Sequence, residues 1–235
     1  MWDNTILLRS IANALIAFSV LTVLYGAIYY AVHLPGLFPL HSVRLSATPQ
    51  RVDAPEVLRV VRNEVRGNLF TVDIEQLRAS LEKLPWVRSV NIRREFPDRL
   101  AVQFEEHQAL ARWNDSALVN RQGEIFVADY EQPLPKFSGQ DEFSFEVVQY
   151  YTQFNELLAA LNFQVEQLAL SPRHAWQLRL SNGMVLELGH EDMPQRLAKF
   201  VAVYPYTKDR MHTAEGGPVY VDLRYRNGFA VRQKV

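Results

Sequence analysis

The chain has 235 residues, of which 48% are hydrophobic, and its formal net charge is −1. This composition provides enough apolar side chains for folded domains and excludes a wholly disordered chain. The near-neutral charge lacks the basic excess that phosphate binding requires, which argues against nucleic acid as a partner. Because the chain has no cysteine, it has neither a disulfide framework nor a thiolate metal site, and cysteine usage says nothing of its compartment.

The first element is an apolar stretch near the amino terminus. Residues 11–32 contain no charged side chain, and a helix of that length reaches about 33 Å, which matches a bilayer core of about 30 Å. Tyr25, Tyr29 and Tyr30 gather near its end, where aromatic rings favour the headgroup level, and Pro35 then stops the helix. The pattern predicts an uncleaved transmembrane helix at 11–33 after a short tail at 1–10.

Two other interpretations of this stretch are weaker, and its orientation stays open. A signal peptide has a shorter apolar region and a small-x-small cleavage site, which residues 33–35 do not supply. A buried core helix would show one apolar stripe, whereas every face here is apolar or small. Arg9 on one side is balanced by Arg44 and Arg51 on the other, so the positive-inside rule does not decide the topology.

A small α+β domain is predicted at 38–108. A short strand falls at 41–46, and Asp53 with Glu56 predicts a capped helix that ends near Gly67-Asn68. Asp73 with Gln76 begins a second helix. Alternating apolar residues on both sides of a turn at 96–98 predict a hairpin. The order strand, helix, helix, strand, strand packs two helices on one face of a three-stranded sheet.

The core of this domain is predicted from the same alternation. Trp86, Val90 and Ile92 follow the pattern of a strand that the two helices cover. We therefore expect these three residues to be core residues and not binding residues.

Residues 109–235 predict a second, mixed domain of strands with helices. The clearest hairpin joins strands at 176–180 and 184–188 around Asn182-Gly183. One helix is expected at 147–161, and another is capped by Asp192 with Gln195. Alternation at Val219, Val221 and Leu223 predicts a final strand.

No constellation for catalysis or metal binding is apparent. The six histidines lack metal-ligand spacing. His190 and Glu191 adjoin Asp192, which is needed as a helix cap. Glu105 and Glu106 are adjacent on a strand and point to opposite faces, so they cannot flank one bond.

Several segments resemble members of the FtsQ/DivIB family, whose soluble part begins with a POTRA domain. The resemblance is carried by Pro85-Trp86-Val87, by Val90-Asn-Ile-Arg-Arg94, by Phe96-Pro-Asp-Arg-Leu100, and by Val102, Phe104 and Glu106. Residues 111–113, 118–120 and 123–126 continue the pattern into the second domain, as do 176–178 and 220–225. With the apolar anchor, the resemblance covers nearly the whole chain.

The resemblance implies a function in cell division. It implies a non-enzymatic scaffold without cofactors, anchored in the bacterial inner membrane at the septum, with a cytoplasmic amino terminus and a periplasmic bulk. Its expected partners are the periplasmic parts of FtsB and FtsL and other membrane proteins of the division complex, with no small-molecule substrate. The complex helps to control septal peptidoglycan synthesis. A POTRA-containing secretion or outer-membrane assembly factor is the alternative, although that class normally has several POTRA repeats or a barrel.

The resemblance also implies where the partner docks. Its expected contact residues are Arg173, His174, Trp176, Arg224, Tyr225, Arg226, Asn227, Gly228 and Phe229, near a sheet edge to which FtsB would add a strand. Tyr225 shares parity with Leu223, so a core tyrosine stays possible. The run Arg88, Arg93 and Arg94 is a candidate for a second contact, or simply a solvated strand face.

Overall fold

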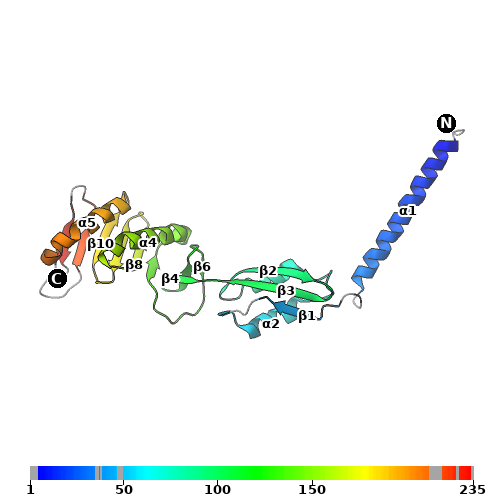
Figure 1. Ribbon diagram of the computed structural model, residues 1–235, viewed down its shortest axis with the longest axis horizontal. Coiled ribbons are helices and arrows are strands. Elements are labelled where there is room, and N and C mark those ends of the chain that lie inside the picture. Colours follow the sequence, from blue (N-terminus) through cyan, green and yellow to red (C-terminus); the bar gives the residue numbers. More distant parts are fainter. Residues whose placement is uncertain are drawn as a thin grey trace. The chain divides into compact units, whose positions relative to one another are not determined.

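The helices and strands fall into two units along the chain, residues 1–106 and 107–235 (Figure 1). The computed structural model describes residues 5–34, 37, 39–46, 50–211, 219–225 and 228–233. Expected features at Pro35, Gly36, Arg226 and Asn227 lie outside the described residues. The overall class is α+β, as predicted.

The amino-terminal helix α1 spans Thr5–His33. Its stretch Leu8–His33 has a mean hydropathy of 2.0, and none of it is buried within the protein. A core helix would be covered by other elements, whereas this helix exposes apolar side chains on all sides. It is long and apolar enough to cross a membrane, which fits a single-pass membrane protein.

The rest of the first unit is a three-stranded sheet with two helices. The strands are β1 (Ser42–Leu45), β2 (Val87–Glu95) and β3 (Arg99–Glu106), in the order β1-β3-β2. β1 runs parallel to β3, and β2 runs antiparallel to it. The helices are α2 (Ala54–Glu64) and α3 (Ile74–Leu81). The predicted order of strand, helix, helix, strand, strand is confirmed.

The predicted core residues of this unit are confirmed. Val90 and Ile92 are buried, and Trp86 is 8% exposed. Trp86 adopts φ 69°, a conformation that bulky residues rarely take, and the Arg51 guanidinium lies 4.6 Å from the centre of its ring. Packing and this cation–π contact together hold the strained residue.

The helix caps were predicted with mixed success. The Asp73 carboxylate accepts a hydrogen bond from the backbone N–H of Gln76 at 2.9 Å, as expected of an N-cap. Asp53 occupies the N-cap position of α2 but makes no side-chain cap bond. The capping box predicted with Glu56 is therefore wrong, and Glu56 instead pairs with Arg59 on the helix surface.

The second unit is built on one nine-stranded sheet. Its strands are β4 (Ala109–Trp113), β5 (Ala117–Asn120), β6 (Ile125–Phe126), β7 (Lys136–Ser138), β8 (Val165–Leu170), β9 (Trp176–Leu180), β10 (Val185–Gly189), β11 (Val219–Asp222) and β12 (Ala230–Gln233). Their spatial order is β12-β11-β10-β9-β8-β7-β4-β5-β6. The pairs β4–β7, β7–β8 and β10–β11 are parallel, and the other pairs are antiparallel.

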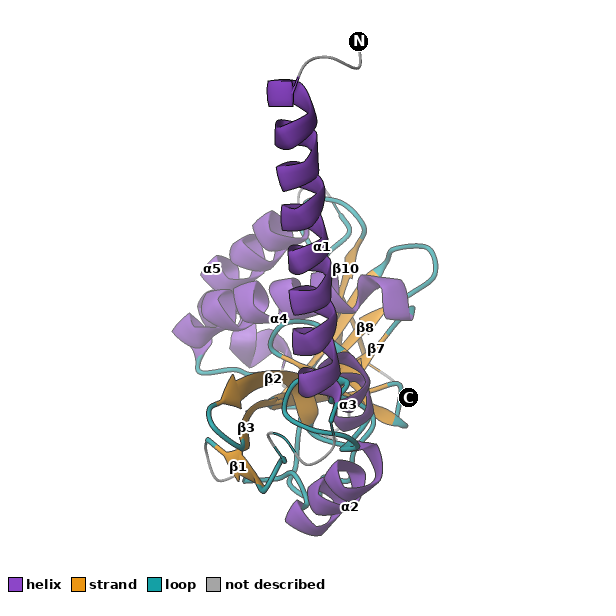
Figure 2. Ribbon diagram, turned by 90° about the vertical axis from the view of Figure 1, so that its right-hand side faces the viewer, coloured by secondary structure: helices purple, strands orange, loops and turns teal. Residues whose placement is uncertain are grey.

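Two long helices, α4 (Ser144–Leu158) and α5 (Met193–Met211), lie on one side of this sheet (Figure 2). Short 3-10 turns, Asp141–Phe143 and Ala159–Leu161, flank α4. Alternate strand residues point towards the helices and form one core around Trp113, Phe137, Phe154, Trp176 and Phe200. The hairpin at 176–189 and both helices occur where the sequence predicts them.

A strand beyond the expected last one was missed. The alternation at 219–223 predicted a final strand, but the chain turns back after β11 and adds β12 antiparallel to it. The reason is local, because Ala230–Gln233 is too short to show a clear alternation. The free edge of the sheet is therefore β12 and not the strand at 219–222.

The burial of Trp86 gives a direct test of the first unit. We expect Trp86→Ala to lower the free energy of unfolding by about 3–5 kcal/mol, because the substitution leaves a large cavity. Thermal and denaturant unfolding of the full chain in detergent measures the change. Phe96 is 66% exposed, so Phe96→Ala is the matched control and should cost much less. Equal stability of the two variants would show that the Trp86 ring does not hold the core.

Candidate functional site

The candidate site lies at one end of the nine-stranded sheet. Trp176 at the start of β9 pairs with Gly189 at the end of β10. β11 runs parallel to β10, and the Leu223 backbone N–H donates to the Glu187 carbonyl at 2.9 Å. The topology therefore brings the turn 171–175 and the segment after β11 to the same end, although about 50 residues separate them.

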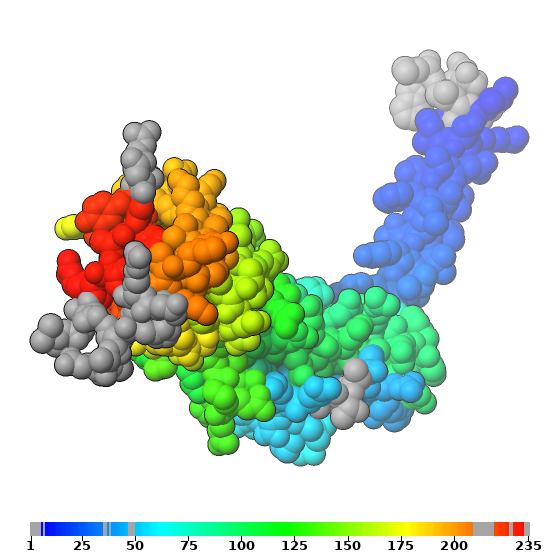
Figure 3. Space-filling model, turned by 60° about the vertical axis from the view of Figure 1, so that its left-hand side comes forward, coloured from blue at the N-terminus to red at the C-terminus, as the bar shows by residue number. Residues whose placement is uncertain are grey.

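A groove lies beside this end, between α5 and residues 223–225 and 228–229. Its volume is about 1100 Å³. Figure 3 shows β11 and β12 beside α5 on this side of the unit. The groove is mixed in character: its apolar side chains are Phe200, Val203, Leu223, Tyr225 and Phe229, and its charged side chains are Glu191, Asp192, Arg196, Lys199 and Arg224. Such a lining suits an amphipathic partner segment.

Two aromatic residues that follow β11 contribute to the apolar surface of the groove. Tyr225 is 60% exposed, because β11 ends at Asp222 and the alternation no longer directs later side chains into the core. Phe229 is partly buried, and its ring meets the Phe200 ring edge-on with centroids 5.8 Å apart. Tyr225 is thus free to contact a partner, while Phe229 forms the groove wall.

The β12 strand is the sheet edge next to this groove. It pairs antiparallel with β11, from Ala230 opposite Asp222 to Gln233 opposite Val219. No described strand pairs with its other side, so the outward backbone N–H and C=O groups there have no strand partner within the described residues. An edge of this kind is a template for an added strand.

Arg224 is held by an acid of its own chain. Its guanidinium donates to both carboxylate oxygens of Asp222, from Nε at 2.8 Å and from a terminal nitrogen at 2.6 Å. These bonds hold the pKa of Asp222 below its usual range and raise the pKa of Arg224. A partner carboxylate would have to share this guanidinium with Asp222.

The residues of the turn 171–175 differ in their availability. Arg173 is exposed and makes no hydrogen bond or ion pair with the described residues. His174 adopts φ 55° and packs its ring edge-on against Phe143, with centroids 4.5 Å apart. Trp176 is 1% exposed and packs against Tyr150. Of these, Arg173 is the side chain that a partner can reach, and Trp176 positions the turn from within the core.

The other charged residues singled out in the sequence have structural partners. Arg88 pairs with Glu105, and Arg94 donates from Nε to the Leu69 carbonyl at 2.7 Å. Glu106 accepts the backbone N–H groups of Gln50, Arg51 and Val52 at 2.9–3.0 Å. These contacts hold loops and strands of the first unit in place. Of the arginine run, Arg93 alone is left without such a contact in the described residues.

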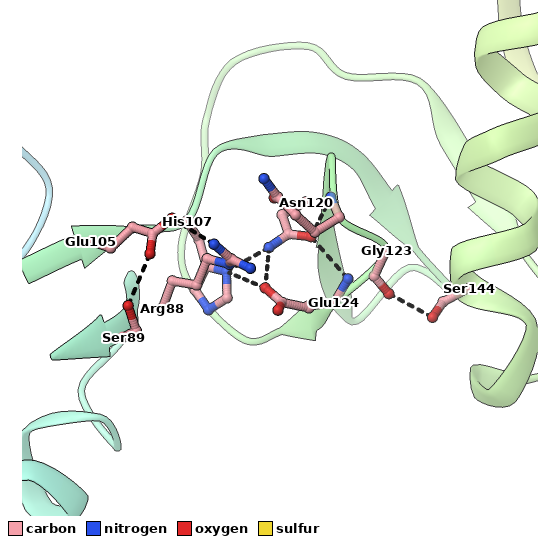
Figure 4. A network of polar contacts seen from close by, with 9 residues as sticks. Arg88, Ser89, Glu105, His107, Asn120, Gly123, Glu124 and Ser144 are labelled. Carbon is pink, nitrogen blue, oxygen red and sulfur yellow. Dashed lines mark hydrogen bonds and ion pairs between the residues drawn. The ribbon is translucent and has the colours of Figure 1, made fainter.

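A buried polar cluster in the second unit also has a structural role (Figure 4). The Asn120 side-chain oxygen accepts the backbone N–H groups of Gln122 and Glu124 at 2.9 and 2.8 Å. Its amide nitrogen lies 3.0 Å from His107 Nδ1. Ser144 donates to the Gly123 carbonyl at 2.6 Å, which ties the β5–β6 turn to the start of α4. Within the described residues, no three His, Cys, Asp or Glu side chains gather so as to hold a metal ion.

Sequence patterns did not reveal three contributors to the groove. Lys199 and Val203 lie on the outer side of α5, where a solvated face is expected. The exposed Val203 side chain was the one available signal of a contact surface there. Gly189 adopts φ 75°, and a Cβ there would lie 2.9 Å from Arg196 and 3.1 Å from Arg224. Glycine at 189 therefore lets these two arginines approach the end of β10.

The comparisons with known proteins agree with this architecture. Residues 38–107 match the family model described as POTRA domain, FtsQ-type, and residues 111–224 match the one described as cell division protein FtsQ/DivIB, C-terminal. The chain belongs to the FtsQ/DivIB family. Tyr225, Phe229 and β12 lie beyond the residues that the second model matches.

Individual members of the FtsQ/DivIB family match the chain over almost its full length. It is 44% identical to the cell division protein FtsQ of Nitrosospira multiformis, over 99% of both chains. It is 38% identical to the cell division protein FtsQ of Burkholderia pseudomallei, over 99% of this chain and 94% of that protein. The match to the Bordetella pertussis protein of the same name is 33% over 98% of this chain and 92% of that protein.

Two glycines allow the crowding around Gly189 to be tested. Gly189 and Gly183 have φ values of 75° and 81°, but a Cβ at 183 would meet nothing within 4 Å. An alanine at either position lowers the free energy of unfolding by roughly 1–2 kcal/mol, because a residue with a Cβ is strained at positive φ. We expect Gly189→Ala to lose a further ~0.5–1.5 kcal/mol, because Arg196 must shift and weaken its bond to the Leu188 carbonyl, measured by denaturant unfolding. Equal losses in both variants would show that the arginines move aside freely.

The Asp222–Arg224 pair predicts a pH dependence. Because the folded pKa of Asp222 is lowered from 3.8, its stabilising effect is present above that value and is lost as the pH falls through the lower folded pKa. We expect Arg224→Ala to raise the pKa of Asp222, as measured by NMR titration of its carboxyl carbon. An unchanged pKa would show that Arg224 does not hold this carboxylate in solution.

Proposed function

We propose that the chain is a non-enzymatic scaffold of the division complex that binds the FtsB and FtsL pair in the periplasm and helps to control septal peptidoglycan synthesis. The observation that carries this proposal is the free β12 edge lying beside a mixed groove. Membership of a cell division family supports a function in the division complex. The structural roles of the polar clusters at Asn120 and at Glu105–Glu106 support a binding function over a catalytic one.

The proposed contact begins with the backbone. A segment of FtsB adds to β12 as a further strand, so that its N–H and C=O groups pair with those of residues 230–233. Backbone pairing supplies affinity that depends little on sequence, and side-chain pockets then supply specificity. The exposed Val231 side chain adds apolar area along the same strand.

The groove supplies the side-chain contacts. An apolar or aromatic residue of the partner lies between Tyr225 and Val203, over the wall made by Phe229. Aromatic residues dominate the binding energy of many interfaces, because they bury a large area with few rotatable bonds. An acidic partner residue pairs with Arg173, which has no competing acid in the described chain, in contrast to Arg224. His174, Gly228 and the residues Arg226 and Asn227 complete the proposed contact set.

The proposed topology follows from the candidate membrane helix and the family. Residues 1–10 form a cytoplasmic tail, 11–33 cross the inner membrane once, and the POTRA domain at 38–108 and the β domain at 109–235 are periplasmic. The protein acts at the division septum. An anchor of this kind keeps the partner-binding groove on the same side of the membrane as the enzymes of wall synthesis.

Binding measurements test the proposed contact. The full chain in detergent is titrated with a labelled periplasmic segment of FtsB. We expect Tyr225→Ala and Arg173→Glu each to weaken binding roughly tenfold or more, as removal of an interface anchor does. The matched controls are Tyr206→Ala, on an 88% exposed tyrosine of α5, and Arg121→Glu, on the exposed β5–β6 turn. Normal binding by both folded test variants would refute the site.

Protease accessibility tests the proposed topology. In spheroplasts, we expect an external protease to digest the region after about residue 35 and to leave the amino-terminal tail protected. The physical reason is that the bilayer excludes the protease from the cytoplasmic side. Protection of residues 36–235 would contradict both the topology and the proposed periplasmic partners.

A further inference from the structure

The sheet face that α4 and α5 leave open carries a row of cations. Strand pairing places one residue of every strand in the same row across the sheet. Four of these residues are basic, Arg112, Lys136, Arg179 and Arg232, and we call them the basic row. Arg112 and Lys136 are direct neighbours on β4 and β7. Like charges in such positions repel each other, so this arrangement favours an anionic partner.

Two acids on the same face of the sheet have partners of their own. Glu187 and Asp222 occupy the adjacent row on β10 and β11. Glu187 accepts a hydrogen bond from the Gln177 amide, and Asp222 is held by Arg224. Neither carboxylate is bonded to Lys136 or Arg179 within the described residues.

Lys136 and Arg179 are weakly neutralised members of the basic row. The Lys136 ammonium reaches only Asp115, at 3.9 Å, and the Asp115 side chain is 88% exposed, so that pair is weak. The Arg179 side chain makes no hydrogen bond or ion pair with the described residues, and its Nε is buried without a partner. A partly buried guanidinium without an acceptor is costly for a chain to hold alone.

These two cations border one hollow. Lys136, Gln167 and Arg179 are consecutive neighbours on β7, β8 and β9, and they line a hollow of about 260 Å³. Lys136 and Arg179 are two strands apart, or roughly 10 Å between backbones, so both long side chains can reach one carboxylate above Gln167. Asp115 and the buried Val185 also line the hollow, whereas the Phe137 and Leu168 side chains belong to the core under the helices.

We propose that this hollow binds an Asp or Glu side chain from an extended acidic segment of a partner protein. Arg179 and Lys136 supply charge-assisted hydrogen bonds to the carboxylate, and the Gln167 amide supplies a neutral donor. An acidic peptide fits better than an anionic membrane, because Glu187, Asp222 and Asp115 are interspersed on the same face and repel a uniformly negative surface. The hollow shares no residue with the β12 groove, so this second contact is independent of the proposed function.

A defined peptide tests the hollow. The full chain, in nanodiscs of zwitterionic lipid, is titrated with a fluorescein-labelled peptide of alternating Glu and Ser, and with the same peptide carrying Gln in place of Glu. We expect binding of the acidic peptide alone, and weaker binding as salt is raised. Arg179→Gln and Lys136→Gln should each weaken it roughly tenfold, as loss of a charged hydrogen bond does.

Matched variants distinguish binding in the hollow from non-specific charge attraction. Arg121→Gln removes an exposed arginine of the same unit, and Tyr225→Ala alters the β12 groove; both should bind the peptide normally. Circular dichroism melting verifies that each variant is folded. Weakening by Arg121→Gln equal to that by Arg179→Gln would overturn the proposal. Equal affinity for the two peptides would also overturn it. So would a lack of peptide binding together with binding to anionic vesicles that Arg179→Gln weakens.

Discussion

Backbone pairing across nine strands is the constraint on which the second unit depends. Each inner strand pairs with a neighbouring strand on both sides, so the edges of the described sheet lie at the two outer strands, β6 and β12. β6 has two residues, and its Phe126 ring stacks on His107 at 4.2 Å, which leaves little edge. β12 is longer and lies beside the groove lined by α5. The same ladder that stabilises the unit thus selects the strand that a partner can extend.

The residues around β12 follow from how the chain reaches that strand. β11 ends at Asp222, and Asp222 binds Arg224 through both carboxylate oxygens. This local pair helps to turn the chain, so Tyr225 leaves the core and Phe229 returns to pack on Phe200. Arg224 therefore acts mainly within the chain, while Arg173, on the turn 171–175 at the same end of the sheet, is available to a partner acid. The groove is assembled from segments that only the sheet topology brings together.

Much of the fold could be predicted because its signals are local. The apolar run of α1, the Asp73 cap, the alternation around Trp86 and the Asn182-Gly183 turn each depend on residues close in sequence. What could not be predicted depends on distant contacts. β12 is too short for a pattern, Trp176 is buried by α4 although its family resemblance suggested a binding residue, and Gly189 matters because two arginines pack against it. The basic row likewise exists only once strands far apart in sequence are paired.

Hydrogen exchange at β12 tests the central claim most directly. The full chain in detergent is compared with and without the periplasmic segment of FtsB, and the exchange of individual backbone amides is followed by NMR. Strand addition predicts slower exchange at residues 230–233, because amides that face solvent gain a partner carbonyl. Tyr225→Ala should reduce this protection at the same segment concentration. Binding that leaves the amides of 230–233 unchanged, while amides of the first unit become protected, would contradict the account.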